Sequence, residues 1–125
     1  MTNNTSSKSL TSFNKNTPLE RIFKNENARI LDFFIINQKF DYTANEVSKS
    51  TKIGLKHVYQ ILKLYKENEL IVNTGKIGSD EKYILNLQSP LVHLLINLFN
   101  TTLNIDIDKI TLFNNHKNFI KVQSR

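Results

Sequence analysis

The side chains best suited to bind a partner lie in one short stretch, KHVYQILK, residues 56–63. At 3.6 residues per helical turn, its apolar residues fall on one face of a helix and its polar residues on the other. A glutamine amide pairs with adenine through two hydrogen bonds, and a lysine donates to guanine or to phosphate. The stretch therefore predicts a face that reads duplex DNA, although each residue alone is equally typical of a solvated helix face. The predicted outward residues are Lys56, His57, Tyr59, Gln60 and Lys63.

Positive charge is concentrated around this stretch. The formal net charge of the chain is +6, which favours a polyanionic partner. Between Val47 and Lys66 there are five lysines and no acidic residue. We therefore add Lys52, just before the stretch, to the residues expected to contact DNA. Acidic residues instead follow this lysine-rich stretch, at Glu67, Glu69, Asp80 and Glu81.

The elements that would position this helix precede it directly. Thr43 and Glu46 have the spacing of a capping box, so a short helix is expected to begin there and to end near Ser50. A turn over residues 51–54 then leads into a longer helix, about residues 55–68. Its predicted inner face consists of Leu55, Val58, Ile61, Leu62 and Tyr65. A helix-turn-helix of this kind places its second helix in the major groove of DNA.

A hairpin is expected to follow. Residues 70–74 and 82–87 have β-forming side chains that partly alternate, and residues 75–81 between them are rich in glycine and charge. The order of elements predicts an α+β, mainly helical fold, a winged helix-turn-helix with a two-stranded β wing. Lys76 in the wing is expected to contact the DNA backbone. The neighbouring acids, Asp80 and Glu81, are expected to point away, and they weaken the tip as a phosphate clamp.

The N-terminal part should supply the support for these elements. Residues 1–17 are polar and are expected to form a disordered tail, without the apolar core of a secretory signal. A first helix is expected over about residues 19–24, with Thr17 as its N-cap and Pro18 in its first turn. A second, capped by Asn25, is expected over about residues 26–37 and is apolar on much of its circumference, including Ile36. No stretch is long enough to span a bilayer, so a cytoplasmic protein without membrane contact is expected.

The C-terminal part begins with another helix. Ser89 and Pro90 predict its start, and it is expected to end near Asn100 and to be apolar almost all round. A second copy of the helix would cover the excess apolar surface and give a homodimer, with two reading helices about 34 Å apart. The alternative is that the last quarter of the chain folds back over it. The expected dimer interface consists of Leu91, Leu94, Leu95, Leu98 and Phe99.

The predicted winged-helix domain thus covers residues 18–100, and residues 101–125 form an extension. In this extension Leu103, Ile105 and Ile107 alternate as in a β-strand. Asp106 and Asp108 would then share one face of the strand, where a solvated acidic turn is a better explanation than a cation site.

Other chemistry finds little support. The chain has no cysteine, which excludes disulfides, thiolate nucleophiles and cysteine-based zinc sites. His57, His93 and His116 lie far apart in sequence, and no phosphate-binding or triad motif is present. We therefore expect no enzyme activity, no metal and no cofactor.

Residues 53–71, IGLKHVYQILKLYKENELI, resemble the recognition-helix region of winged-helix transcription regulators of the arsenic-repressor and multiple-antibiotic-resistance-repressor types. The resemblance covers about residues 26–100 and rests on the inner positions Val47, Ile53, Val58 and Leu62. It implies a DNA-contact role for the outward positions and no ligand-sensing residues. Glu69 stands where this pattern usually has glycine.

The leading hypothesis is therefore a sequence-specific transcription regulator that binds double-stranded DNA. One alternative is a winged-helix protein-interaction module within a transcription, replication or segregation assembly, for which the wing acids and the apolar C-terminal helix are also suited. A small-molecule sensor built on the same fold is a third possibility.

Overall fold

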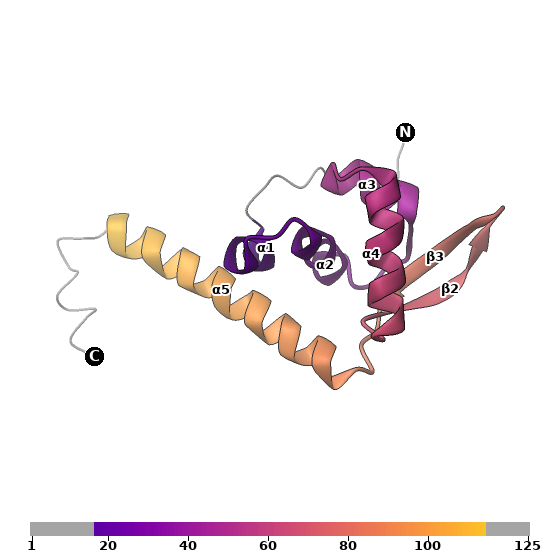
Figure 1. Cartoon of the computed structure of the whole chain (residues 1–125). Helices are drawn as coiled ribbons and strands as arrows, with labels where there is room; N and C mark the ends of the chain where they lie inside the picture. Colours follow the sequence, from indigo (N-terminus) through magenta and orange to yellow (C-terminus); the bar gives the residue numbers. More distant parts are fainter. Residues whose placement is uncertain (1–16, 115–125) are drawn as a thin grey trace.

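The computed structural model describes the backbone of residues 17–114 and the side chains of residues 17–105. Its helices are α1 (Pro18–Phe23), α2 (Asn27–Ile36), α3 (Ala44–Thr51), α4 (Leu55–Glu67) and α5 (Pro90–Asn114). Its strands are β1 (Tyr42–Thr43), β2 (Ile71–Ile77) and β3 (Asp80–Leu85). The β2–β3 hairpin projects on one side of α4, and α5 runs out past α1 on the opposite side (Figure 1).

The core is built around α2. Its residues Ile30, Phe33 and Phe34 are completely buried. Tyr42 of β1 packs edge-on against Phe33, with 4.7 Å between the ring centroids. The predicted apolar stripe of α2 is thereby confirmed. Ile36 does not belong to the stripe, because it is the last residue of the helix and its side chain is 52% exposed.

A buried carboxylate caps α1. Asp32 of α2 accepts hydrogen bonds from the backbone N–H groups of Leu19 and Glu20, at 3.0 and 3.1 Å, and from the hydroxyl of Thr17. Thr17 occupies the N-cap position but makes no side-chain capping bond, so the expectation that it caps the helix is wrong in that respect. Burial raises the pKa of the Asp32 carboxyl, against the lowering effect of these hydrogen bonds.

A buried arginine joins three helices. The guanidinium of Arg29, in α2, donates through Nε and Nη2 to the Glu20 carboxylate of α1, at 3.0 and 2.7 Å. Its Nη1 donates to the backbone carbonyl of Thr51, the last residue of α3, at 2.7 Å. The side chains of Arg29 and Glu20 are only 5% and 11% exposed. This pair is not predictable from the sequence, because charged residues within an apolar helix carry no periodic signal.

The helix-turn-helix has the predicted local structure. In the capping box, Glu46 N–H donates to the Thr43 hydroxyl at 3.3 Å, and Thr43 N–H donates to the Glu46 carboxylate at 2.9 Å. After α3 the chain reverses at Lys52, whose φ of 62° lies in the left-handed region. The inner residues of α4, Val58 and Leu62 among them, are buried against the rest of the domain.

The sheet is larger than predicted. Its strand order is β1-β3-β2, all antiparallel, and Tyr42 of β1 pairs with Tyr83 of β3. The prediction of a seven-residue loop is also wrong. The pairing of β2 with β3 continues to Ile77 and Asp80, so that a two-residue turn remains. Gly75 lies at a bulge in β2, with φ of 145°, and not in a loop. The glycine was expected to lie in a loop, and it instead lies at a bulge within a strand, where glycine is common.

The C-terminal helix is longer than predicted. α5 is continuous from Pro90 to Asn114, so both the expected end near Asn100 and the strand-like reading of residues 103–107 are wrong. No proline or glycine interrupts residues 91–114, and the helical hydrogen bonds therefore continue. In the described part of the chain, no helix combines the length and the apolar character needed to cross a membrane.

The Arg29–Glu20 pair gives a first prediction. Arg29→Met leaves the Glu20 carboxylate buried without its guanidinium, and we expect the free energy of unfolding to fall by about 3 kcal/mol in a urea titration. In the double variant Arg29→Met with Glu20→Leu, much of this loss should be recovered, because no uncompensated charge remains. Equal losses in the single and double variants would contradict this explanation.

Candidate nucleic-acid interface

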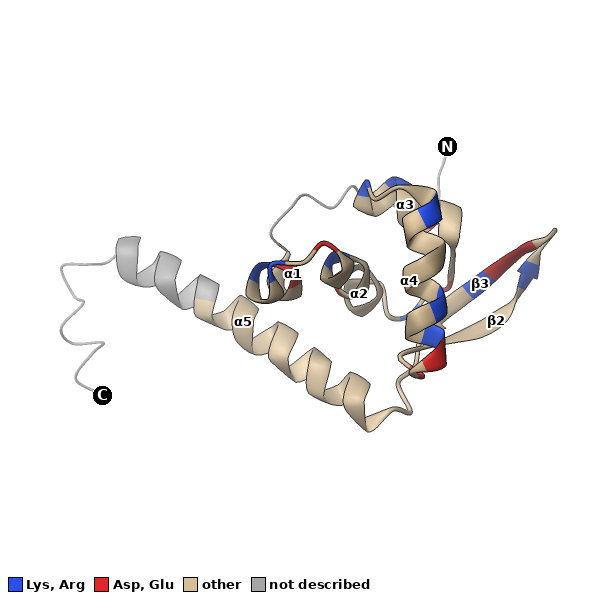
Figure 2. Ribbon diagram, viewed as in Figure 1, with Lys and Arg blue, Asp and Glu red and all other residues tan. Residues whose placement is uncertain are grey.

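The outer face of α4 carries four of the five predicted side chains. Lys56, Tyr59, Gln60 and Lys63 are all exposed, and Tyr59 is 51% exposed. Lys56, Gln60 and Lys63 follow one another at spacings of four and three residues, which places them in one row along the helix. Figure 2 shows basic residues along α3 and α4, with acidic residues at the far end of α4 and along β3.

His57 is placed differently from the prediction. Its side chain is half-buried, and its Nε2 lies 2.5 Å from Oδ1 of Asn27 at the start of α2. The imidazole is therefore turned toward the body of the protein and not toward the outer face. The reason is tertiary, because helical spacing puts position 57 at the edge of the outer face, where α2 offers it a partner.

The two remaining lysines that were predicted to contact DNA lie outside α4. Lys52 is exposed between α3 and α4, and Lys76 is exposed on β2. In the ladder, Lys76 is paired with Glu81 of β3. The carboxylate of Glu81 accepts hydrogen bonds from the hydroxyl of Tyr83, at 2.8 Å, and from the amide of Asn73, at 3.0 Å. Lys76 thus sits beside a carboxylate that is already hydrogen-bonded by other groups.

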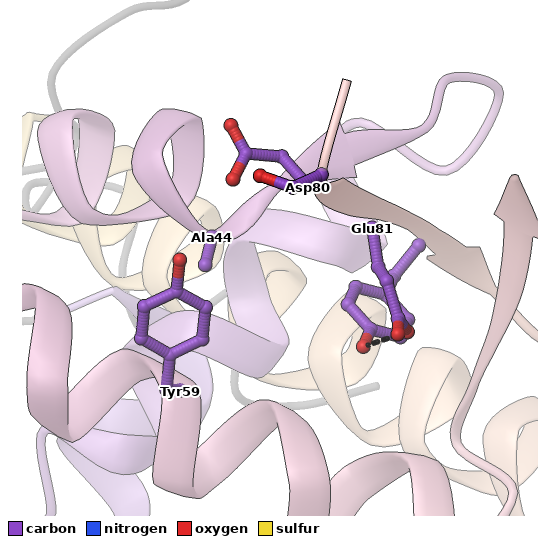
Figure 3. Close-up of a pocket in the computed structure, with 6 residues that line it drawn as sticks. Ala44, Tyr59, Asp80 and Glu81 are labelled. Atoms are coloured by element: carbon purple, nitrogen blue, oxygen red, sulfur yellow. Dashed lines mark hydrogen bonds between the residues drawn. The ribbon is translucent and has the colours of Figure 1, made fainter. Parts of the chain in front are cut away.

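The wing acids Asp80 and Glu81 border a hollow beside α4. Asp80, Glu81, Ser79 and Tyr83 of the hairpin line a hollow of about 210 Å³ together with Tyr59 of α4 and Ala44 of α3. In Figure 3, Tyr59 rises from α4 toward Ala44, and Asp80 lies across the hollow from it. The expectation that the acids point away from DNA stays a prediction. Negative charge therefore borders the wing side of α4.

The wing is held to the body by charged and polar contacts. Asp41, just before β1, accepts a hydrogen bond from the hydroxyl of Thr74 in β2 at 2.7 Å and pairs with Lys82 of β3 at 3.4 Å. Lys82 is therefore engaged within the sheet. Burial, together with the hydrogen bond to Glu81, raises the pKa of Tyr83 to about 12, so this hydroxyl remains a donor at neutral pH.

The residues of α5 that were predicted to form the dimer interface differ in their burial. Val92, Phe99 and Thr102 are buried within the chain's own structure, and α5 contacts α1. Phe99 is therefore not available to a partner, and Leu95 is half-buried against the core. Among the α5 residues whose side chains are described, the exposed apolar ones are Leu91, Leu94, Leu98, Leu103 and Ile105.

Metal binding finds no site in the described residues. Within this part of the chain, no three or more histidine, cysteine, aspartate or glutamate side chains are grouped so that they could hold a metal ion. The imidazole of His93 instead contacts the backbone carbonyl of Leu87 at 2.6 Å. Asp106, Asp108 and His116 lie outside the residues whose side chains are described.

Comparison with known proteins identifies the fold. No protein-family model matches the sequence, and no curated protein is significantly similar to it. A mutant of ZitR from Lactococcus lactis in apo form has a similar structure, with a TM-score of 0.57 and 15% identity over 84% of this chain and 82% of that one. MepR, a transcription regulator of the Staphylococcus aureus multidrug efflux pump MepA, is similar with a TM-score of 0.56 and 17% identity over 85% and 80%. A MepR mutant from a multidrug resistant S. aureus clinical isolate gives 0.59 and 14% over 88% and 80%.

At these identities the likeness concerns the fold. It confirms the predicted winged-helix fold, mainly helical with a small antiparallel sheet.

The exit of α4 gives a second prediction. Glu69, at the position where glycine was expected, has φ of 60°, so the left-handed turn is kept without glycine. A side chain in this region costs about 1–2 kcal/mol, and glycine costs about 0.5–1 kcal/mol in chain entropy. Glu69→Gly should therefore raise the free energy of unfolding by up to about 1 kcal/mol. Glu67→Gly, which removes the same charge at the last residue of α4, should lower it, by less than the roughly 1 kcal/mol that glycine costs in a helix interior. A loss in both variants would contradict this reading of the turn.

Proposed function

We propose that the protein is a transcription regulator that binds specific double-stranded DNA, with α4 in the major groove. The observation that supports this most directly is the exposed row Lys56, Gln60 and Lys63, free of carboxylates, on a helix braced by α3 in a helix-turn-helix. Such a helix fits the major groove of B-DNA. The similarity in fold to MepR, a transcription regulator, points in the same direction.

The side chains divide into two roles under this proposal. Gln60, Tyr59 and Lys56, toward the start of α4, are placed to reach base edges and to supply specificity. Lys52, Lys63 and Lys76 supply attraction to phosphates and so contribute affinity with little dependence on sequence. Because Asp80 and Glu81 border the wing side of α4, the wing is the weaker of the two contact regions.

Charge reversal on α4 gives a third prediction. The double variant Lys56→Glu with Lys63→Glu should lose DNA binding by at least about 100-fold, because two phosphate-attracting charges become repulsive. The control is Lys24→Glu with Lys39→Glu, which changes the net charge equally but lies outside α3, α4 and the wing. Fluorescence anisotropy with a duplex selected from a random pool measures both variants.

The same experiment separates the rival interpretation. If the protein is instead an interaction module for another protein, both variants should bind DNA equally poorly at physiological salt. Wild-type binding that does not weaken as salt rises would also contradict the electrostatic part of the proposal.

The exposed face of α5 supports a homodimer. Leu91, Leu94, Leu98, Thr101 and Ile105 succeed one another at spacings of three, four, three and four residues, which is the seam of a coiled coil. The four apolar members are between 36% and 65% exposed in the single chain. A second copy of α5 would cover this seam with matching spacing, and we include the homodimer in the proposal. The interface is then Leu91, Leu94, Leu98 and Ile105, without Phe99.

The seam gives a fourth prediction. Leu94 is 65% exposed in the single chain. A glutamate at this position would place a charge against the partner helix, so Leu94→Glu is expected to be monomeric. The control is Ile36→Glu, at a comparably exposed apolar residue on α2, which should leave the dimer intact. Sedimentation equilibrium measures the mass in solution. A dimeric Leu94→Glu variant, or a monomeric wild type, would contradict the proposed interface.

A further inference from the structure

Asn27, the first residue of α2, contacts α4 at two points. Its Oδ1 lies 2.5 Å from Nε2 of His57, in the first turn of α4. Its backbone carbonyl accepts a hydrogen bond from the hydroxyl of Tyr65 at 2.8 Å. Because an amide oxygen is only an acceptor, the imidazole proton is on Nε2 of His57. His57 and Tyr65 are eight residues apart, about 12 Å along a helix, so two long side chains converge on one residue and fix both the position and the tilt of α4.

The anchor at Asn27 is itself held in place. The side chain of Asn25 accepts a hydrogen bond from the backbone N–H of Asn27 at 2.7 Å. Two residues further along α2, Arg29 is bound to the carbonyl of Thr51 at the end of α3. The start of α2 therefore connects to α3 and to α4, the two helices of the helix-turn-helix. Burial raises the pKa of Tyr65 to about 12, so its hydroxyl keeps its proton and remains a donor to Asn27.

We propose that Asn27 is a positioning residue for DNA recognition, which sets through His57 and Tyr65 the angle at which α4 presents Lys56 and Gln60. This inference rests on the proposed function. Hydrogen bonds to base edges require a defined geometry, whereas the attraction of lysines to phosphates tolerates small rotations. Asn27 therefore controls discrimination between sequences and not overall attraction to DNA.

The proposal gives His57 a different role from the one its sequence position indicates. Its neighbour Lys56 faces outward, but the imidazole is directed toward Asn27. His57 acts on recognition through Asn27 and not through contact with a base. The two roles predict different results when both residues are changed together.

The experiment is a double-mutant cycle with Asn27→Ala and His57→Ala. Each variant is titrated with a duplex selected by the wild-type protein from a random pool and with a scrambled duplex at the same salt concentration. Each single variant should lower the ratio of specific to non-specific affinity by about tenfold, and the double variant should lower it no further. Affinity for the scrambled duplex and its salt dependence should stay unchanged. Additive losses would show that His57 contacts DNA itself and would overturn the proposal.

Two further variants distinguish positioning from general stability. Asn27→Asp keeps an acceptor oxygen for His57, so it should keep the specificity ratio within about threefold of the wild type. Asn37→Ala removes a similar side-chain hydrogen bond at the other end of α2, from Asn37 to the carbonyl of Phe33 at 2.8 Å. It should lower stability without changing the ratio. An equal fall in the ratio for Asn37→Ala would overturn the positioning role.

Nitrogen NMR of the free protein provides a readout without DNA. The wild type should show the Nε2–H tautomer of His57, and Asn27→Ala should shift the amide signals of the first turn of α4. If the wild type prefers no duplex sequence, the proposed function fails and the positioning role falls with it. If the wild type is specific but Asn27→Ala leaves both the α4 signals and the specificity ratio unchanged, only the positioning role is overturned.

Discussion

The arrangement of this protein depends on one buried guanidinium. Arg29 donates to the Glu20 carboxylate of α1 and to the carbonyl of Thr51, where α3 ends and the turn toward α4 begins. Without it, a carboxylate and a helix-terminal carbonyl would be left without these partners inside the domain, at a cost of several kcal/mol. The geometry of a guanidinium, which offers several donors in a fixed plane, is what allows one side chain to serve two helices.

The position of α4, the candidate DNA-recognition helix, follows from these Arg29 contacts in steps. Arg29 fixes the end of α3, the left-handed residue Lys52 reverses the chain, and the buried side of α4 then packs on the core. Asn27 adds two contacts from the same end of α2. The candidate DNA-binding face is thus exposed because the opposite face of α4 is fixed by neighbours on α2 and α3.

Charge is distributed unevenly over this face, and the fold determines how. The lysines of α3 and α4 are near one another in sequence and remain so in space. Asp80 and Glu81 are distant in sequence, but the hairpin returns them to the side of Tyr59. Under the proposed function, a carboxylate beside α4 disfavours phosphate on that side, so the wing acids would limit where DNA could approach.

The local elements follow from the amino-acid sequence. The capping box at Thr43, the inner stripe of α4 and the start of α5 at Pro90 were all predicted, because caps and periodicity act between residues a few positions apart. The outer residues of α4 except His57 followed from the same periodicity.

Other features depend on how the elements pack. The direction of His57, the burial of Phe99, the pairing of β1 with β3 and the network around Arg29 all depend on residues far along the chain. The full length of α5 was also not predicted. The apolar residues at every second position of residues 103–107 are typical of a strand, but a helix whose faces differ in burial can carry them as well. Local sequence fixes which face a residue occupies on its own element, whereas the partner that faces it is set by how the elements pack.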